Sequence, residues 1–499
     1  MQGVARSTAR ASVHSAMNWF AAPEAEVARW ILQRGTALVY LLAFVSTARQ
    51  FPALLGERGL LPAPRLLERS SRLGPTLFSR VRYTDRRLLA VCWAGGAIAV
   101  LLLLGLPQLG PDWLPAVAFL AVWLLYLSIV HIGQTFYGFG WETLLLETGF
   151  LVGFLGSAAS PPPRLIVIAL LWLAFRLEFG AGLIKLRGDE AWRDLTALDY
   201  HHETQPMPNP LSRTAHLMPR WWHRVEVVGN HVSQLIAPFL LLLPQPIASA
   251  AGIVLILTQG WLLLTGNFAW LNALTIVIGC AALGDGVVHA LLPAVPADLG
   301  AAADLPLPWF VVTTAVALLV LVLSWRPALN LLSRDQLMNA SFNRWRLVNA
   351  YGAFGSVTRH RDEVVIEGTE ADRPAEADWH EYGFHGKPGD PQRRPRQWAP
   401  YHLRLDWLLW FVPLGAAHEP WFAELLAHLL AADPRILRLL RDDPFSGRPP
   451  RWIRVRMFRY RFARRDEHRA SGAIWVRHEL YELVRPVSAA DLRPSASEG

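Results

Sequence analysis

The sequence is short of charge, of lysine and of cysteine. Only 18% of its 499 residues are charged, whereas 53% are apolar; soluble domains carry about 25% charged residues. This balance excludes a disordered or fibrous chain and argues against an ordinary cytosolic enzyme. The two cysteines, Cys92 and Cys280, both lie in apolar stretches, which excludes a disulfide framework.

The basic residues are almost all arginine. Lys185 and Lys387 are the only lysines, and the net charge is +8. A basic balance is compatible with nucleic-acid binding, but here the basic residues are scattered through segments that flank apolar runs. That distribution is typical of a membrane protein. We therefore expect no nucleic-acid partner.

Apolar runs long enough to cross a bilayer recur through the first two thirds of the chain. A hydrocarbon core of about 30 Å requires about 20 apolar residues in a helix. The candidate windows are 30–48, 88–106, 113–130, 144–156, 165–186, 228–243, 247–264, 271–283 and 308–325. Windows 144–156 and 271–283 are short, and tilted, re-entrant or buried helices all fit them. We expect about eight spans.

Composition divides the chain further. We expect a mobile tail at 1–28, a helical membrane domain at 29–333 with a polar loop at 187–226, and a disordered tail at 488–499. Residues 334–487 predict a β-rich extramembrane domain, because runs of β-branched and aromatic residues alternate with Gly/Pro turns. These runs are VVIEG, PYHLRLDWLLWFVPLG, RWIRVRMFRYRF and AIWVRHELYELV. Between them, EPWFAELLAHLLAADPRILRLL predicts two helices separated at Pro434. The fold class is a multi-pass α-helical membrane protein with this domain at its C-terminal end.

Several long strings resemble the lipase maturation factor family. The similarity begins at RWILQRGTALVYLLAFVSTARQFPALLGERGLLP, is most specific at RLEFGAGLIKLRGDEAWRDLTALDYHHETQPMPNPLS and extends over about residues 29–485. It implies a multi-pass protein that, in animals, lies in the endoplasmic reticulum membrane and helps homodimeric secreted lipases reach an active fold. It also implies binding without a cofactor, with a secreted or exported client such as a lipase and membrane lipid as partners.

The context of this chain differs from that of the animal members. Near-total use of arginine and the absence of lumenal cysteines indicate a bacterial cell membrane. If there are nine spans, residues 49–87, the polar loop and the C-terminal domain share one side, opposite the N-terminus. The positive-inside rule would place that side in the cytoplasm, but long segments escape the rule. Because the resemblance implies an exported C-terminal domain, we predict that this domain lies outside the cytoplasm.

A shorter string, AGLIKL, is similar to the superfamily of vitamin K-dependent γ-glutamyl carboxylases. Lys185 matches the lysine that is the proposed base on reduced vitamin K in those enzymes. The alternative function is therefore a membrane enzyme acting on a lipophilic quinone or another lipid, with Lys185 as base and His131 assisting. The simpler interpretation is a lysine at the end of a span whose ammonium reaches the interface.

The window that ends near Lys185 carries two further charges. Glu178 lies two turns before Lys185 on the same helix face, and Arg176 lies nearly opposite. For Glu178 we favour an ion pair with a neighbouring helix over a catalytic role. Glu142 and Glu147 lie about 140° apart on a helix, so they cannot act as a carboxylate pair.

The polar loop gathers acids and histidines. If this segment is extended, Asp199, His201 and Glu203 project to one side. Histidine and carboxylate suit zinc, but an adjacent His-His pair without a third spaced cluster favours mutual hydrogen bonding, so we predict no metal. The candidates for client or ligand binding in the whole chain are Arg176, Glu178, Asp194, Asp199, His201, His202, Glu203, Asn209, His223, Glu226, Asn230 and His231.

The sequence lacks the common signature motifs of other activities. The sequence has no G-x-S-x-G, P-loop, G-x-G-x-x-G or H-E-x-x-H motif, so it carries none of these signatures for hydrolysis or nucleotide binding. A transporter is disfavoured, because the chain shows no paired broken helices in corresponding halves.

Overall fold

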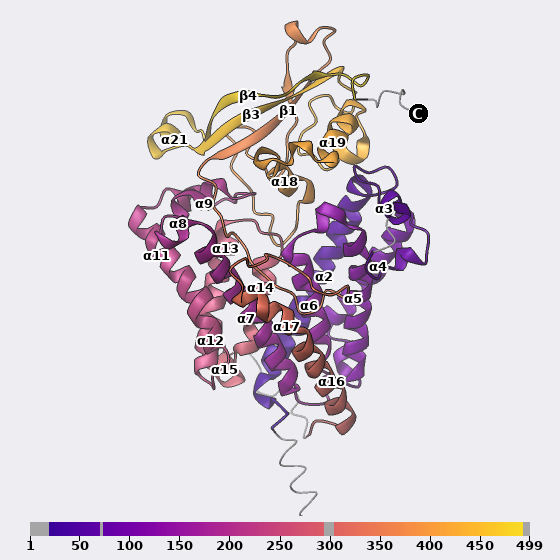
Figure 1. Ribbon diagram of the computed structural model, residues 1–499, viewed down its shortest axis with the longest axis vertical. Coiled ribbons are helices and arrows are strands. Elements are labelled where there is room, and N and C mark those ends of the chain that lie inside the picture. The colour runs from indigo at the N-terminus through magenta and orange to yellow at the C-terminus, as the bar shows by residue number, and fades with distance from the viewer. Residues whose placement is uncertain (1–18, 70–72, 294–303, 493–499) are drawn as a thin grey trace, which may run out of the picture.

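The computed structural model describes residues 19–69, 73–293 and 304–492. A bundle of helices forms one end of the molecule and a small sheet with short helices forms the other (Figure 1). Six segments of the described chain are long and apolar enough to span a membrane: Pro23–Leu54 with α2 (Glu26–Leu54), α4 (Asp85–Leu104), α5 (Trp113–Ile132), α7 (Arg164–Gly188), α13 (Ile247–Thr265), and Leu307–Leu332 with α16 (Leu307–Leu323) and α17 (Trp325–Leu332). A pair bent by 114°, Leu271–Ala282 and Asp285–Leu291, makes up to seven. The predicted multi-pass helical fold is confirmed, and the predicted number of about eight spans was approximate.

Shorter helices fill the space between these spans. All of α6 (Gly140–Gly153) is buried, so the short window at 144–156 is a buried helix. Helix α11 (Arg220–His231) continues through a π-helical turn at Val232–Ile236 into α12 (Ala237–Leu240). The other helices of this part are α3 (Ala63–Arg69), α8 (Glu190–Arg193), α9 (Leu198–Thr204), α10 (Ser212–His216), α14 (Leu271–Gly279) and α15 (Asp285–Leu291).

Hydrogen bonds between segments far apart in sequence mark the two ends of the bundle. At the end that carries the N-terminal segment, Ala22 N–H donates to Pro162 O (2.9 Å), and Asp285 accepts from the backbone N–H of Glu26 (3.1 Å) and Val27 (3.0 Å). In the described part of the predicted tail, residues 19–28, the chain thus bonds to the bundle and begins α2 at Glu26. Residues 1–18 of that tail, like 493–499 of the C-terminal one, lie outside the described residues.

The opposite end carries α3, the polar loop and the C-terminal domain (Figure 1). The contact there is direct, because Gln50 Nε2 near the end of α2 donates to His402 O (2.6 Å). The described residues of the arginine-rich segment 49–87, the polar loop and the C-terminal domain thus lie at the same end of the bundle.

The C-terminal domain contains an antiparallel sheet in the order β2-β1-β3-β4. Its strands are β1 (Arg361–Thr369), β2 (His380–Glu381), β3 (Trp452–Phe462) and β4 (Trp475–Val487). In β3, Ile453, Val455 and Met457 are buried while Arg454 and Arg456 are not, as a strand with one covered face requires. Its helices are α18 (Arg404–Leu409), α19 (Pro420–Leu430), α20 (Pro434–Leu437) and α21 (Arg465–Ser471).

Three of the four runs that we predicted as strands contribute to strands, and the fourth does not. VVIEG, RWIRVRMFRYRF and AIWVRHELYELV contribute to β1, β3 and β4, and the two helices separated at Pro434 are α19 and α20. The run PYHLRLDWLLWFVPLG was wrongly taken as strand, because it forms α18. Leu405, Leu408 and Leu409 follow helical spacing, and all six residues of α18 are buried.

Residues 333–360, which we call the strap, contain neither helix nor strand. The strap runs across the helices before the chain enters β1 (Figure 1). A Cβ on Gly180 of α7 would overlap the carbonyl oxygen of Tyr351, so the absence of a side chain there permits this close approach. The first part of the predicted domain 334–487 therefore packs on the helical domain rather than on the sheet.

Candidate functional site

Lys185 lies inside the helical domain in a network of side-chain amides. Its ammonium donates to Asn230 Oδ1 and to Gln234 Oε1, both at 2.8 Å, and lies 4.6 Å from the ring centroid of Trp192. The residue is 4% exposed. The ammonium therefore ends in a buried hydrogen-bonded site, so the interpretation that it reaches the interface does not hold for this structure.

The same network holds Glu178. Its carboxylate accepts from Gln234 Nε2 (3.1 Å) and Gln259 Nε2 (2.7 Å), and Gln259 Oε1 accepts from Asn272 (2.7 Å). The residues come from α7, the π-helical turn, α13 and α14. The neighbouring helices thus meet Glu178 with amides, where we had favoured an ion pair.

Arg176 faces away from this network and forms a second one. Its guanidinium pairs with Glu147 of α6 and donates to Asn349 O of the strap (2.6 Å). Glu147 also accepts from the side chain of Asn349 and from the hydroxyl of Tyr351, each at 2.9 Å. Since Arg176 and Glu147 are both almost fully buried, the pair depends on these extra hydrogen bonds to offset its desolvation.

Glu142 forms a third buried cluster, separate from Glu147, as its position on the helix predicted. It accepts from Arg404 of α18 (2.7 Å) and from the hydroxyl of Tyr126. Arg404 also donates to Phe136 O (2.8 Å). The ion pair between Glu142 and Arg404, in which neither side chain is exposed, thus joins the C-terminal domain to the helices.

The polar loop is helical where we considered an extended segment. Residues 198–204 form α9, so Asp199, His201 and Glu203 do not project to one side. His201 packs against the rings of Phe268 and Phe354, with centroids 6.1 and 5.1 Å away. Burial, with the nearby His202, lowers the pKa of His201 to about 3.

The next residue of α9 faces α11. His202 Nε2 lies 3.6 Å from Glu226 Oε2, and His223 Nδ1 lies 3.1 Å from the same oxygen. Burial alone would raise the pKa of Glu226, but the neighbouring imidazoles of His202 and His223 outweigh burial and hold the pKa at about 2. The acid is therefore ionised between two imidazoles.

Glu203 and Asn209 connect the polar loop to the C-terminal domain. Glu203 accepts from Phe462 N–H at the end of β3 (2.7 Å), and Asn209 Nδ2 donates to Gln397 Oε1 (3.0 Å). Arg361 at the start of β1 donates to the carbonyls of Glu203 (2.8 Å) and Gln205 (2.5 Å). These two candidates hold domains together.

The remaining candidates are dispersed. His131 Nδ1 bonds Pro75 O (2.9 Å), and the structure does not bring it to Lys185. His231 Nε2 bonds Trp192 O (3.0 Å). Asp194 is exposed and Asp199 is half-buried.

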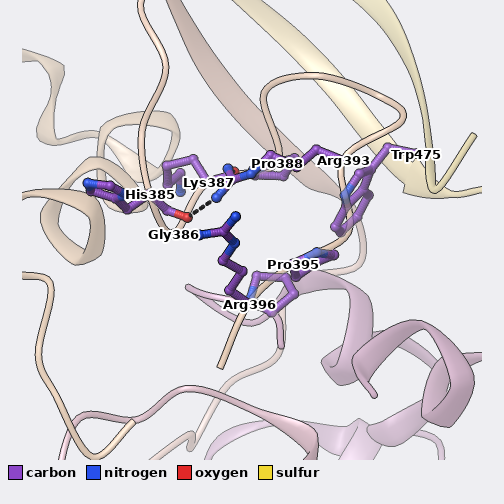
Figure 2. A pocket seen from close by; sticks show the side chains of 9 residues that line it. His385, Gly386, Lys387, Pro388, Arg393, Pro395, Arg396 and Trp475 are labelled. Carbon is purple, nitrogen blue, oxygen red and sulfur yellow. Dashed lines mark hydrogen bonds between the residues drawn. The ribbon is translucent and has the colours of Figure 1, made fainter. Parts of the chain in front are cut away.

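A small pocket opens between the polar loop and the sheet (Figure 2). Its lining residues are Pro208, His385, Gly386, Lys387, Pro388, Arg393, Pro395, Arg396 and Trp475. Arg393 donates to the carbonyls of Phe384 (3.0 Å), His385 (2.7 Å) and Lys387 (3.2 Å). The guanidinium thus bonds the backbone of its own loop, which stiffens the pocket wall.

Comparison with known proteins decides the family. The model of the lipase maturation factor transmembrane domain matches residues 27–290, and that of the lipase maturation factor C-terminal domain matches residues 347–485. The chain belongs to the lipase maturation factor family. It is 40% identical to lipase maturation factor 1 of Bos taurus over 93% of this chain and 90% of that protein. The corresponding figures are 39%, 93% and 88% for lipase maturation factor 1 of Homo sapiens, and 28%, 93% and 82% for lipase maturation factor 2 of Gallus gallus. No solved structure matches the chain.

Within this lipase maturation factor homologue, sequence reasoning missed the partners of the charged residues. Gln234, Gln259 and Asn349 look like ordinary polar residues in the sequence, yet each meets a buried charge. For Gln234 and Gln259 the available signal was an uncharged amide inside an apolar window, because a buried amide requires a hydrogen-bond partner; for Asn349, in the strap, the sequence offered no such signal.

Proposed function

We propose that this chain promotes the maturation of secreted lipases or related exported proteins by binding them without covalent chemistry. The observation that carries the proposal is 40% identity, over nearly the whole chain, to a protein named lipase maturation factor 1. The membrane-spanning helices anchor the protein, and membrane lipid surrounds them. Near-exclusive use of arginine supports a bacterial membrane for this chain, and the endoplasmic reticulum suits the animal relatives.

The C-terminal sheet offers a surface for a client. In the described part of the chain, β4 pairs with β3 on one side and with no strand on the other, and most of its residues are exposed or half-exposed. An extended client segment can add to such an edge through main-chain hydrogen bonds. Charges of both signs along β4, such as Arg477 and Glu479, protect the edge from indiscriminate pairing.

The buried charges support binding rather than catalysis. Glu142, Glu147 and Glu178 each bond to side chains of other helices, of the strap or of the C-terminal domain. Lys185 donates to two amide oxygens, at 2.8 Å each, so its amine is engaged as a hydrogen-bond donor within the helical domain. A base on a quinone needs a free lone pair facing its substrate, so we do not retain the carboxylase-like alternative.

The proposal is tested in animal cells that lack lipase maturation factor 1 and express a secreted homodimeric lipase. Expression of this chain is expected to raise the secreted lipase activity per unit of lipase protein, and the lipase is expected to co-purify with it. Secreted activity that stays at the level of empty vector, with the chain folded in the membrane, refutes a role with that lipase.

A pair of variants tests the edge strand. Tyr481 of β4 is 54% exposed and Leu414, elsewhere in the domain, is 50% exposed. We expect Tyr481→Ser to weaken lipase co-purification several-fold, whereas Leu414→Ser leaves it unchanged. Equal effects of both substitutions would exclude β4 as the client surface.

A further inference from the structure

Three potential metal ligands converge between α9 and α11. His202, His223 and Glu226 each place one donor atom within 4.8 Å of the others. Glu226 Oε2 lies 3.6 Å from His202 Nε2 and 3.1 Å from His223 Nδ1. Tetrahedral zinc with bonds of about 2.0–2.1 Å spaces its ligand atoms about 3.3 Å apart. Two of the three spacings are therefore close to those of a zinc site, and because all three donor atoms lie within 4.8 Å of one another, small side-chain rotations would bring the third to the same value.

The outer contacts of His223 and Glu226 match those of metal ligands. His223 Nε2 bonds His216 O (3.3 Å), and Glu226 Oε1 accepts from Trp261 Nε1 (2.6 Å). Histidine ligands almost always bond a carbonyl or carboxylate through their second nitrogen, and ligating carboxylates are held in the same way. These contacts leave His223 Nδ1 and Glu226 Oε2 facing His202.

His202 supplies the independent observation. Its side chain is 3% exposed, and among the described residues neither ring nitrogen has a partner within hydrogen-bond distance, since Glu226 Oε2 lies 3.6 Å from Nε2. Buried polar side chains in native proteins nearly always have a partner. A cation between His202 Nε2 and the other two donors would satisfy one of these nitrogens.

We propose that His202, His223 and Glu226 bind one zinc ion, with water in the fourth position. Two imidazoles and one carboxylate with an open position form a known zinc donor set. The ion would fasten α9 to α11, the helix that also carries Asn230 of the Lys185 network. This departs from our expectation of no metal, because adjacent His201 and His202 do not reveal that only the second faces α11.

Metal analysis of the full-length protein in detergent tests the site. After chelator treatment and reconstitution with Zn²⁺ or Co²⁺, we expect about one metal ion per chain, with the visible absorption of tetrahedral Co²⁺. His202→Gln and His223→Gln should each lower the affinity at least tenfold. His428→Gln is the matched control, because His428 also pairs with an acid, Asp433 at 2.9 Å, outside the cluster, and it should bind metal like wild type.

Two results of the metal analysis would overturn the zinc proposal. Folded wild-type protein that retains less than about a tenth of a metal ion per chain after reconstitution overturns the proposal. Equal affinity in wild type and His202→Gln also overturns it. If the His variants fail to fold, the wild type alone decides, because zinc must raise the melting temperature of the chelator-treated protein and a chelator must reverse the rise.

Discussion

The ammonium of Lys185 and the carboxylate of Glu178 are connected through one amide. Gln234 accepts from Lys185 through Oε1 (2.8 Å) and donates to Glu178 through Nε2 (3.1 Å). The amide is thereby oriented by a cation on one side and an anion on the other, and charge-assisted hydrogen bonds of this kind are stronger than neutral ones. The arrangement assigns both charged residues to the cohesion of the helices.

Lys185→Met is expected to destabilise the protein rather than to abolish a chemical step. It leaves the oxygens of Asn230 and Gln234 buried without their donor, and each unsatisfied group costs about 1–3 kcal/mol. Melting temperature in detergent should fall by several degrees, whereas Arg224→Met, at an exposed position of α11, should leave it unchanged. A Lys185→Met protein with wild-type melting temperature and no maturation activity would restore the catalytic interpretation.

Glu147→Leu should be among the most damaging substitutions in the helical domain. It removes the partner of buried Arg176 and an acceptor for Asn349 and Tyr351, and breaking a buried pair costs about 3–5 kcal/mol. The double variant Glu147→Leu/Arg176→Met leaves no unpaired charge, so it should recover part of the loss. The stability of the single and the double variant is measured by the yield of monodisperse protein and by the melting temperature. A double variant that is less stable than Glu147→Leu would contradict the ion-pair explanation.

Acid should weaken the fold through His201. Its folded pKa of about 3 lies below the ordinary value of 6.5, so the unfolded state binds the proton more tightly. The stabilisation is complete above pH 6.5 and is lost as pH falls toward 3, by at most about 1.4 kcal/mol per pH unit. His201→Phe preserves the stacking on Phe268, and it should flatten the decline of melting temperature between pH 7 and 5.

Two features of the experiment separate the titration of His201 from other effects of acid on stability. Chelator-treated protein is used, so that acid cannot act by releasing a metal. The comparison is between wild type and variant, because burial raises the pKa of Asp406 to about 6, which contributes stability of the opposite pH dependence in both. Identical pH profiles would show that His201 does not titrate on unfolding.

The C-terminal domain is predicted to lie outside the cytoplasm. Alkaline phosphatase fused after residue 492 should be active in a bacterial host, and a cytoplasmic fluorescent protein at the same position should be dark. A fusion at residue 110, between α4 and α5 at the opposite end of the bundle, should give the reverse pattern. The opposite result for both positions would place the domain, and the client surface proposed for it, in the cytoplasm.

Hydropathy and the positions of turn-forming residues were sufficient to predict much of the fold from the sequence. Long apolar windows located the spans because a helix in lipid must be apolar over its length, and Pro434 separated α19 from α20 because proline interrupts a helix. The strand prediction for the segment that contains α18 was wrong because the aromatic residues of that segment are clustered. Clustered aromatic residues are compatible with a buried strand and with a buried helix equally.

The site was less predictable, because its contacts join residues far apart in sequence. Spacing placed Lys185 and Glu178 on one helix face, but their shared partner, Gln234, lies 49 residues after Lys185. Likewise, the His-His pair predicted a polar cluster without showing which ring faces Glu226. Local patterns report the face of a helix, not what packs against it.

The strap and α18 also constrain how the protein is made. Glu147 obtains Asn349 as a partner only after 202 further residues, and Glu142 obtains Arg404 only after 262. When α6 enters the membrane, the ribosome has therefore not yet synthesised these groups. The inserted helices therefore pass through an intermediate in which both acids lack these partners, and a chain that ends before the strap cannot complete either network.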